Sequence, residues 1–503
     1  MFPWLTTLGL IPLVGSAAVA LLPKGRDLLA KQLALGVSLL SLLISLLMLT
    51  GFKTNTGTLQ LVESHDWIST FGIKYAVGVD GIALMMVLLA TILAPIVILG
   101  SWNEAENGRF SVKTFFALLL MLETFMVGVF SATDVFLFYV FFEAMLIPVY
   151  FLIGSFGGAQ RSYAAVKFLL YSLFGGLLML AAVIALYVIS KDQLGAPTFD
   201  ITALTKLHFG ALTERWLFLG FFIAFAIKAP LWPFHTWLPD AASAATPGTA
   251  VLLVGVLDKV GTFGMLRYCL PLFPGAAKYF TPLIIVLSVI SVVYGALLAI
   301  GQTDIKRLIA FTSISHFGFI TLGIFAMTSQ GQSGATLYMV NHGFSTAALF
   351  LIAGWMISRR NSSTISDFGG LQRVTPVMAW TFFLAGLSAL ALPGMSSFVS
   401  EFLVLVGTYT RYPWAAIIAT GGIILAALYV LILIQRTMHG PVTAGNENLP
   451  DLTLREKLAI APVIAIIIFL GFYPKPILDV VNPSVAHTMQ VVGVTDPAPT
   501  GGK

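Results

Sequence analysis

The sequence of 503 residues is poor in charge and has almost no cysteine. Asp, Glu, Lys and Arg together make up only 10% of the residues and hydrophobic residues make up 58%, whereas soluble domains are about 25% charged. The single cysteine, Cys269, excludes a disulfide framework and a cysteine-ligated iron–sulfur cluster within this chain. GxGxxG and GxxxxGK[ST] patterns are also missing, so the sequence gives no support for a nucleotide site. These shortages predict a polytopic membrane protein without its own redox centre.

The surplus of positive charge is small and dispersed. The formal net charge is +5, but the basic residues are scattered among short loops. A nucleic-acid-binding protein would gather them in a patch or run. We therefore expect the lipid bilayer, and no nucleic acid, as the surroundings of this chain.

Long apolar runs are what the sequence has in abundance. A membrane span needs about 20 mostly apolar residues. The runs that meet this rule are 4–22, 30–51, 77–101, 113–131, 134–154, 163–190, 216–239, 248–270, 280–301, 307–327, 334–358, 376–408, 413–436 and 458–481. The sequence predicts an all-α polytopic membrane protein with about 14 transmembrane helices. The first run lacks the positive region that opens a signal peptide, so we expect an uncleaved span there.

The distribution of lysine and arginine predicts the orientation. Loops after odd-numbered spans are richer in these residues than loops after even-numbered spans. Positive loops stay in the cytoplasm, so both termini are expected on the non-cytoplasmic side. The expected location is the bacterial plasma (inner) membrane.

Two spans contain helix-breaking residues. The seventh is interrupted at KAPLWP, residues 228–233, and the twelfth at ALPGMSSF, residues 391–398. Proline cannot donate a backbone hydrogen bond and clashes with the preceding turn. The two breaks lie five spans apart, which predicts two inverted five-helix repeats, and paired broken helices point to a transport site. The expected units are 1–112, 113–270 (helices 4–8), 271–438 (helices 9–13) and 439–503.

Charged residues inside these runs are the strongest functional signal. Glu143 lies in the fifth span and Lys228 precedes the break of the seventh. Intramembrane charges are costly and usually face a partner or a water-filled cavity. We expect these two to form a coupled pair that switches between paired and separated states. A static ion pair between two helices is the plain structural alternative.

Lys259, in the eighth span, is the candidate for a central proton carrier. Its neighbours in the sequence are mostly apolar, and desolvation favours the neutral amine, so reversible loss of a proton is feasible. Asp258 precedes it, but adjacent positions of a helix do not face each other. His316 and His342, in consecutive spans, suit a proton relay because histidine titrates near neutrality. A snorkelling lysine and hydrogen-bonded core histidines are the structural alternatives.

Three further residues complete the candidate site. Glu401 follows the break of the twelfth span and is a candidate terminal acid. Glu123, in the fourth span, is a secondary candidate that could exchange protons with Glu143. His235 follows the break of the seventh span and is expected to line it. No metal site is expected, because no additional His, Cys or acid has suitable spacing.

Several stretches carry a resemblance to a known family. KAPLWPFHTWLPDA resembles the signature of the antiporter-like membrane subunits shared by respiratory complex I and Mrp-type cation/proton antiporters. VGVDGIALMMVLL, DVFLFYVFFEAMLIPVYFLIG, GVLDKVGTFGMLR, GQTDIKRLIAFTSISHFGFITLGIF, ISDFGGL and SSFVSEFLVLVGTY narrow the resemblance to the M-type chains of bacterial complex I. Glu401 stands where the L- and N-type relatives usually carry lysine. One stretch departs from the family pattern: ASAATPGTAVLL follows LPDA, where an acidic or polar residue and APT are more usual.

The resemblance implies a fold, a set of roles and partners. The family fold has fourteen helices, inverted five-helix repeats and discontinuous helices 7 and 12. By resemblance, Glu143 and Lys228 form a gating ion pair, Lys259 is the central carrier, and Glu401 is the terminal acid. His316 and His342 continue the hydrated axis between them. The chain would be a subunit of the translocase NADH:quinone oxidoreductase, with L- and N-type chains and small membrane chains as partners. NADH, FMN, iron–sulfur clusters and quinone would be bound by partner subunits.

Two other functions remain open from the sequence. The chain could belong to an Mrp-type sodium/proton antiporter that is driven by ion gradients without NADH. It could also be a structural scaffold of a membrane arm whose channel is inactive. In the scaffold case, substitutions of the buried lysines would affect assembly without affecting pumping.

Overall fold

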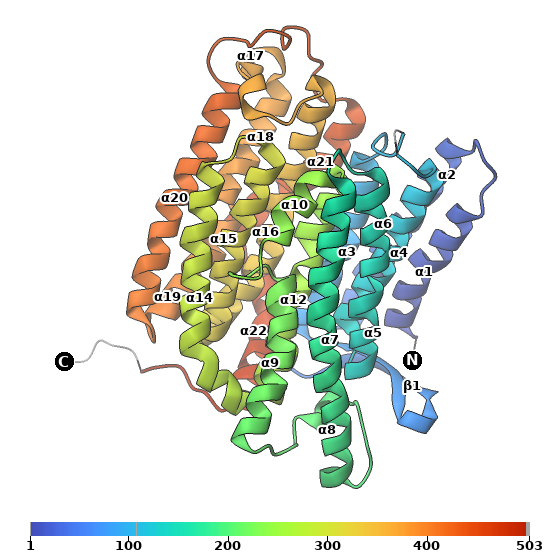
Figure 1. Ribbon diagram of the computed structural model, residues 1–503, viewed down its shortest axis with the longest axis vertical. Helices are drawn as coiled ribbons and strands as arrows, with labels where there is room; N and C mark the ends of the chain where they lie inside the picture. Colours follow the sequence, from blue (N-terminus) through green and yellow to red (C-terminus); the bar gives the residue numbers. More distant parts are fainter. Residues whose placement is uncertain (1, 107, 499–503) are drawn as a thin grey trace.

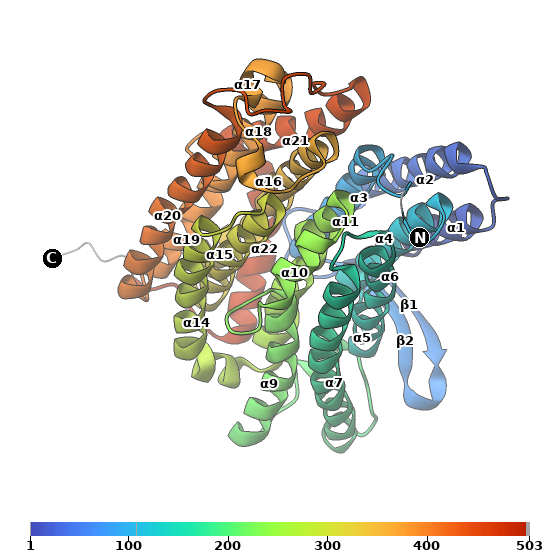
Figure 2. The same ribbon diagram turned by 45° about the horizontal axis from the view of Figure 1, so that its top comes forward.

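The computed structural model describes residues 2–106 and 108–498, and the chain is almost entirely helical. Its helices run side by side along the long axis of the molecule (Figure 1). The N-terminal helices lie on one flank and the C-terminal helices on the opposite flank, with the middle of the chain between them, as both views show (Figures 1 and 2). Segments far apart in the sequence therefore meet in the middle of the bundle.

The first part of the chain contributes the helices of one flank. They are α1 (Trp4–Ala20), α2 (Asp27–Met48), η1 (Leu49–Gly51), α3 (Gly81–Gly100), α4 (Val112–Ser131), α5 (Val135–Ala144), α6 (Leu146–Phe156), α7 (Arg161–Leu194) and α8 (Ile201–Leu204). The predicted fifth span is thus divided at Met145, between α5 and α6.

The centre and the other flank follow. They consist of α9 (Ala211–Lys228), α10 (Trp237–Ala244), α11 (Pro247–Leu252), η3 (Leu253–Leu257), α12 (Lys259–Gly264), η4 (Met265–Cys269), α13 (Leu270–Leu272), α14 (Pro274–Ile300), α15 (Ile305–Phe325), α16 (Ser329–Arg360), η5 (Ile365–Asp367), α17 (Leu371–Val374), α18 (Pro376–Ala389), α19 (Ser396–Tyr409), α20 (Pro413–Met438), α21 (Leu454–Phe472) and α22 (Lys475–Val492).

Each of the fourteen predicted runs contains at least one helix, but the count of fourteen spans is not confirmed. Among the described residues, 10 helices are long and apolar enough to cross a membrane, or up to 11 if α21 and α22 are one span bent by 70°. The bend in the last run, at Tyr473 and Pro474, was not expected. Pro474 and Pro476 flank the start of α22, where backbone amides are missing and a straight continuation is blocked.

One element contradicts a purely helical fold. β1 (Gln60–Ile68) and β2 (Ile73–Val79) form an antiparallel hairpin between α2 and α3, joined through the short η2 (Ser69–Phe71) and by Gly72 at a φ of 65°. The third span, predicted from residue 77, therefore begins only at Gly81. Asp80 fixes this start, because its carboxylate accepts a hydrogen bond from the Ala83 amide at 2.9 Å.

Both predicted helix breaks are present. The seventh run stops at Lys228 and resumes at Trp237, and the twelfth stops at Ala389 and resumes at Ser396. In the first break, the Trp237 indole donates a hydrogen bond to the carbonyl of Ile227 at 2.9 Å. This bond ties the two halves together and satisfies a carbonyl at the end of α9.

The eighth run lies at the centre of the bundle and is irregular. It alternates short α-helical pieces with two π-helical turns, η3 and η4. All of the apolar window of this run is enclosed by other helices, as is that of α15, whereas α7 and α20 keep broad exposed apolar faces. Single π-turns within α-helices often accompany functional sites, and η3 directly precedes the Asp258–Lys259 pair.

Candidate functional site: a buried row of ionisable side chains

Lys259 is fully buried and makes two short hydrogen bonds. Its ammonium Nζ lies 2.5 Å from the carbonyl oxygen of Val254 and 2.7 Å from Nδ1 of His342. In the π-turn η3, the Asp258 amide donates a hydrogen bond to the carbonyl of Leu253, five residues earlier. The Val254 carbonyl is thereby available to the side chain of Lys259, which also lies 5.0 Å from the centre of the Phe317 ring.

His342, on α16, connects this lysine to the next helix. When Lys259 donates to Nδ1, the neutral imidazole carries its proton on Nε2. Nε2 lies 3.2 Å from the hydroxyl of Thr346, one turn later on the same helix, and can donate to it. The ring is therefore held between a donor and an acceptor.

His316, on α15, continues the row. Its ring centre lies 5.1 Å from that of His342, with the two rings nearly perpendicular. Its Nε2 lies 3.3 Å from the hydroxyl of Tyr429 on α20. The ring of Tyr338, on α16, is 5.8 Å away. The structure thus brings the two predicted histidines together, as the relay interpretation requires.

Glu401, on α19, lies at the far end of the row and is buried. Tyr429 and Tyr338 are both within electrostatic reach of its carboxylate. Both tyrosines are also near His316, and sequence reasoning missed both. A tyrosine in an apolar helix is common and carries no charge signal, so only its position beside His316 identifies it.

Lys228, the last residue of α9, is buried and its ammonium has no hydrogen-bond partner in this structure. It lies 5.2 Å from the ring centres of both Phe142 and Phe168. Cation–π attraction of this kind partly replaces lost hydration.

The expected ion pair between Glu143 and Lys228 is not formed. The two charges are within electrostatic reach, but Glu143 Oε1 has no hydrogen-bond partner. A methyl group added to Gly176 of α7 would lie 1.6 Å from Glu143 Oε1. The glutamate therefore lies against the backbone of α7 at Gly176, while the lysine lies beside the two aromatic rings.

The two secondary candidates lie apart from the row. The carboxylate of Glu123 is fully buried and has no hydrogen-bond partner, and its polar neighbour is Ser41 on α2. The expected exchange of protons between Glu123 and Glu143 stays a prediction. His235 lies in the break of the seventh run, as expected, with its ring 5.2 Å from that of Tyr294.

Asp258 is a further buried residue that the sequence analysis did not include among the candidates. Its side chain is fully buried and neither carboxylate oxygen has a hydrogen-bond partner. Its carboxylate is within electrostatic reach of both Lys259 and Lys228. The sequence argument considered only a direct pair between Asp258 and Lys259. It could not show that Lys228, at the end of α9, is also within electrostatic reach of Asp258.

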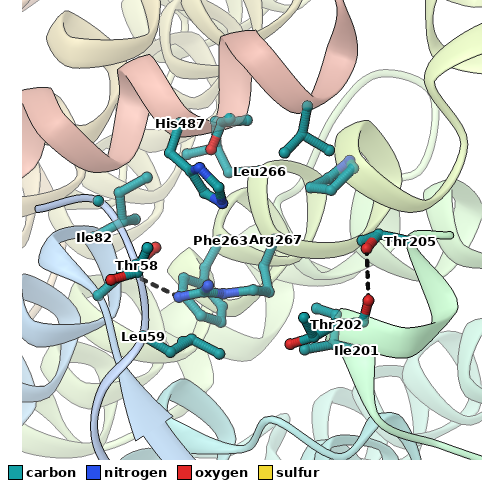
Figure 3. A pocket seen from close by; sticks show the side chains of 15 residues that line it. Thr58, Leu59, Ile82, Ile201, Thr202, Thr205, Phe263, Leu266, Arg267 and His487 are labelled. Carbon is teal, nitrogen blue, oxygen red and sulfur yellow. Dashed lines mark hydrogen bonds and ion pairs between the residues drawn. The ribbon is translucent and has the colours of Figure 1, made fainter.

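A pocket of about 390 Å³ opens at the other end of the eighth run. Figure 3 shows Phe263 and Arg267 at its centre, with Thr58 and Leu59 on one side and Thr202 on the other. Phe263 lies one turn after Lys259 on α12, so the two share a helix face.

An ion pair forms part of the lining of this pocket. The Arg267 guanidinium contacts the carboxylate of Asp80 at 2.6 Å and lies 5.4 Å from the ring centre of Phe263. Phe263 and Arg267, which line the pocket, come from the same run of the chain as Lys259.

Comparison with known proteins identifies the family. Residues 132–426 match the family described as NADH:quinone oxidoreductase/Mrp antiporter, TM. The chain belongs to this family. The NADH-quinone oxidoreductase subunit M of Mycobacterium tuberculosis is 53% identical, over 99% of this chain and 96% of the relative. That of Rhodobacter capsulatus is 41% identical, over 97% of this chain and 96% of the relative. The predicted resemblance to M-type chains is confirmed.

Solved structures agree with this family assignment. A chain of respiratory complex I from Thermus thermophilus has a TM-score of 0.88 and 30% identity, covering 97% of this chain and 100% of that one. A chain of the Mrp complex from Dietzia sp. DQ12-45-1b has a TM-score of 0.84 at 20% identity, covering 98% and 100%. The second likeness shows that this family member shares its fold with an Mrp chain.

Proposed function

We propose that this chain is a proton-translocating membrane-arm subunit of an NADH:quinone oxidoreductase. The observation that carries the proposal is the run of contacts from Lys259 through His342 and His316 to Tyr429. The two relatives described above are subunits of NADH-quinone oxidoreductase, and their names indicate the enzyme. Electron transfer takes place in partner subunits, which bind NADH, FMN, iron–sulfur clusters and quinone, while this chain moves protons.

Each proton step follows from the contacts of the row. Lys259 donates a proton from Nζ to Nδ1 of His342, so one N–H bond breaks and another forms. The resulting imidazolium passes a proton to His316, across the perpendicular ring contact and with water where the rings do not touch. Tyr429 then connects His316 to Glu401, which releases the proton. Burial makes these charges interact strongly, so a shift of one changes the protonation of the next.

Glu143 and Lys228 are the natural trigger of the cycle. They lie separated in this structure, each without a hydrogen-bond partner on its key atom. Pairing of these two groups would draw the Lys228 charge away from Asp258, which is within electrostatic reach of both lysines. The Asp258 carboxylate would then act on Lys259 alone and favour its protonated form, because a nearby opposite charge stabilises the ammonium. Separation would reverse the effect and favour release of the proton towards His342.

The antiporter alternative rests on the shared fold with the Mrp chain. The 53% and 41% identities belong to oxidoreductase subunits and favour the oxidoreductase. Sodium dependence discriminates between the two. An antiporter subunit would exchange sodium for protons without NADH, whereas the proposed subunit moves protons only during NADH oxidation.

The experiment is NADH-driven acidification in proteoliposomes that contain the purified parent complex or its Lys259→Ala variant. Pumping is expected to fall at least about tenfold, since proton transfer by one positioned group typically contributes about 10²–10⁴-fold. Lys191→Ala is the matched control, because Lys191 is exposed at the end of α7. An assembled Lys259→Ala complex that pumps like the parent would exclude this role for Lys259. Sodium–proton exchange without NADH would favour the antiporter.

A further inference from the structure

We propose that Asp258 is a proton-transfer residue that joins Lys228 to Lys259. This inference rests on the proposed function and extends it, because the direct contacts of the row begin only at Lys259. No hydrogen bond connects Lys228 to Lys259 among the described residues. Asp258 is the group that lies within electrostatic reach of both.

The first support is the isolation of the carboxylate. Asp258 has 0% exposure and both of its oxygens lack a hydrogen-bond partner. Buried polar atoms are almost always hydrogen-bonded, so two such oxygens on one acid call for an explanation. Asp134, another buried acid, does have partners: it accepts hydrogen bonds from the amides of Phe136 and Leu137, both at 2.9 Å. Asp258 serves no such capping role.

The second support is the direction in which Asp258 faces. Gly261 lies three residues later, on the same side of the helix. A methyl group added to Gly261 would lie 2.4 Å from the Ala229 amide and 2.4 Å from the Phe225 carbonyl. This face of α12 is therefore packed closely against the end of α9, where Lys228 precedes Ala229. The absence of a side chain at Gly261 allows this approach and brings Lys228 to the side of Asp258.

The chemistry of the two steps is balanced. An N–H bond of the Lys228 ammonium breaks, and its proton forms an O–H bond with the Asp258 carboxylate. That O–H bond then breaks as the proton reaches the neutral amine of Lys259. The carboxylate returns to its starting form, Lys228 has lost one proton and Lys259 has gained one. Asp258 thus transfers the proton between Lys228 and Lys259, which lie on different helices and share no hydrogen bond among the described residues.

A static counter-charge is the competing role. A carboxylate between two ammonium groups would stabilise both without taking a proton. The two roles differ in one observable property. A relay is protonated during turnover, whereas a static counter-charge stays ionised throughout.

The test compares Asp258→Asn and Asp258→Glu in the assembled complex. Asn keeps the size of the side chain but cannot take up and release the proton, so NADH-driven pumping is expected to fall at least about tenfold. Glu keeps the carboxyl group and should retain pumping within about twofold of the parent. Asp192→Asn is the control, because Asp192 is exposed on α7. Parent-level pumping by Asp258→Asn would overturn the inference.

A spectroscopic measurement decides the case even if Asp258→Asn does not assemble. Redox-induced infrared difference spectra of the parent complex should contain a carbonyl band of a buried protonated carboxyl, and Asp258→Glu should shift it. A spectrum that is identical in the two complexes would overturn the inference in favour of the static role. The Lys259→Ala result separates the two proposals: if Lys259→Ala abolishes pumping and Asp258→Asn does not, only the role of Asp258 fails.

Discussion

Lys259 Nζ lies 2.7 Å from His342 Nδ1, and this contact joins α12 to α16. Lys259 belongs to the first predicted five-helix unit and His342 to the second. A lysine that serves only as a structural cation would be expected in a salt bridge with an acid or at the interface. Here its partners are a backbone carbonyl and an imidazole, which leaves the ammonium free to give up its proton.

Replacing His342 tests this contact directly. In His342→Gln the amide oxygen can still accept a hydrogen bond from Lys259, but the side chain cannot carry a proton. We expect an assembled complex whose NADH-driven pumping is at least about tenfold lower. Proteoliposome acidification is the measurement, with His439→Gln, at an exposed histidine, as the control. Equal pumping by the two variants would remove His342 from the pathway.

Tyr429 should matter for the step after His316. Tyr429→Phe removes the hydroxyl that lies 3.3 Å from His316 Nε2, while the ring still fills its buried site. We expect pumping to fall at least about tenfold, since a positioned proton-transfer group typically contributes about 10²–10⁴-fold, with assembly unchanged. Tyr409→Phe is the matched control, since Tyr409 is 55% exposed. If Tyr429→Phe matches that control, the link to Glu401 runs through Tyr338 or water.

Gly176 sets the position of the Glu143 side chain. The added methyl group of Gly176→Ala would overlap Glu143 Oε1, which is the end of a flexible chain, so the glutamate should rotate away and the fold should survive. We expect normal assembly with a pumping rate changed by several-fold, because the distance from Glu143 to Lys228 sets their electrostatic coupling. The comparison is Gly421→Ala, where the methyl group meets open space. Pumping equal to that of Gly421→Ala would contradict a gating role for this geometry.

The Asp80–Arg267 pair should contribute to stability. Arg267→Ala leaves the Asp80 carboxylate largely buried and deprived of its cation. The expected loss of stability is about 3 kcal/mol, the low end for breaking a buried pair, because the arginine is partly exposed. Thermal unfolding of the purified complex measures it. The exposed pair Lys475–Asp479 provides the control, since Lys475→Ala should leave the unfolding temperature unchanged.

Several features of the fold could be predicted from local chemistry. Apolar runs with two lysines indicated a membrane protein with buried functional charges. The prolines at 230 and 233, and Pro393 with Gly394, indicated two broken helices that the structure contains. The β-hairpin was missed, because its second strand runs directly into the apolar pattern of α3.

The sequence by itself determined which side chains a bilayer would reject: Glu143, Lys228, Lys259 and Glu401 stand out because the cost of burying a charge depends on the residue and its apolar neighbours. Only the tertiary structure decided which of them meet. Lys259 contacts His342, Tyr429 contacts His316, and Asp258 is within electrostatic reach of two lysines, whereas Glu143 and Lys228 form no ion pair among the described residues. These relationships join separate helices, and their geometry depends on a π-turn and on glycine contacts that become visible only when the helices are packed.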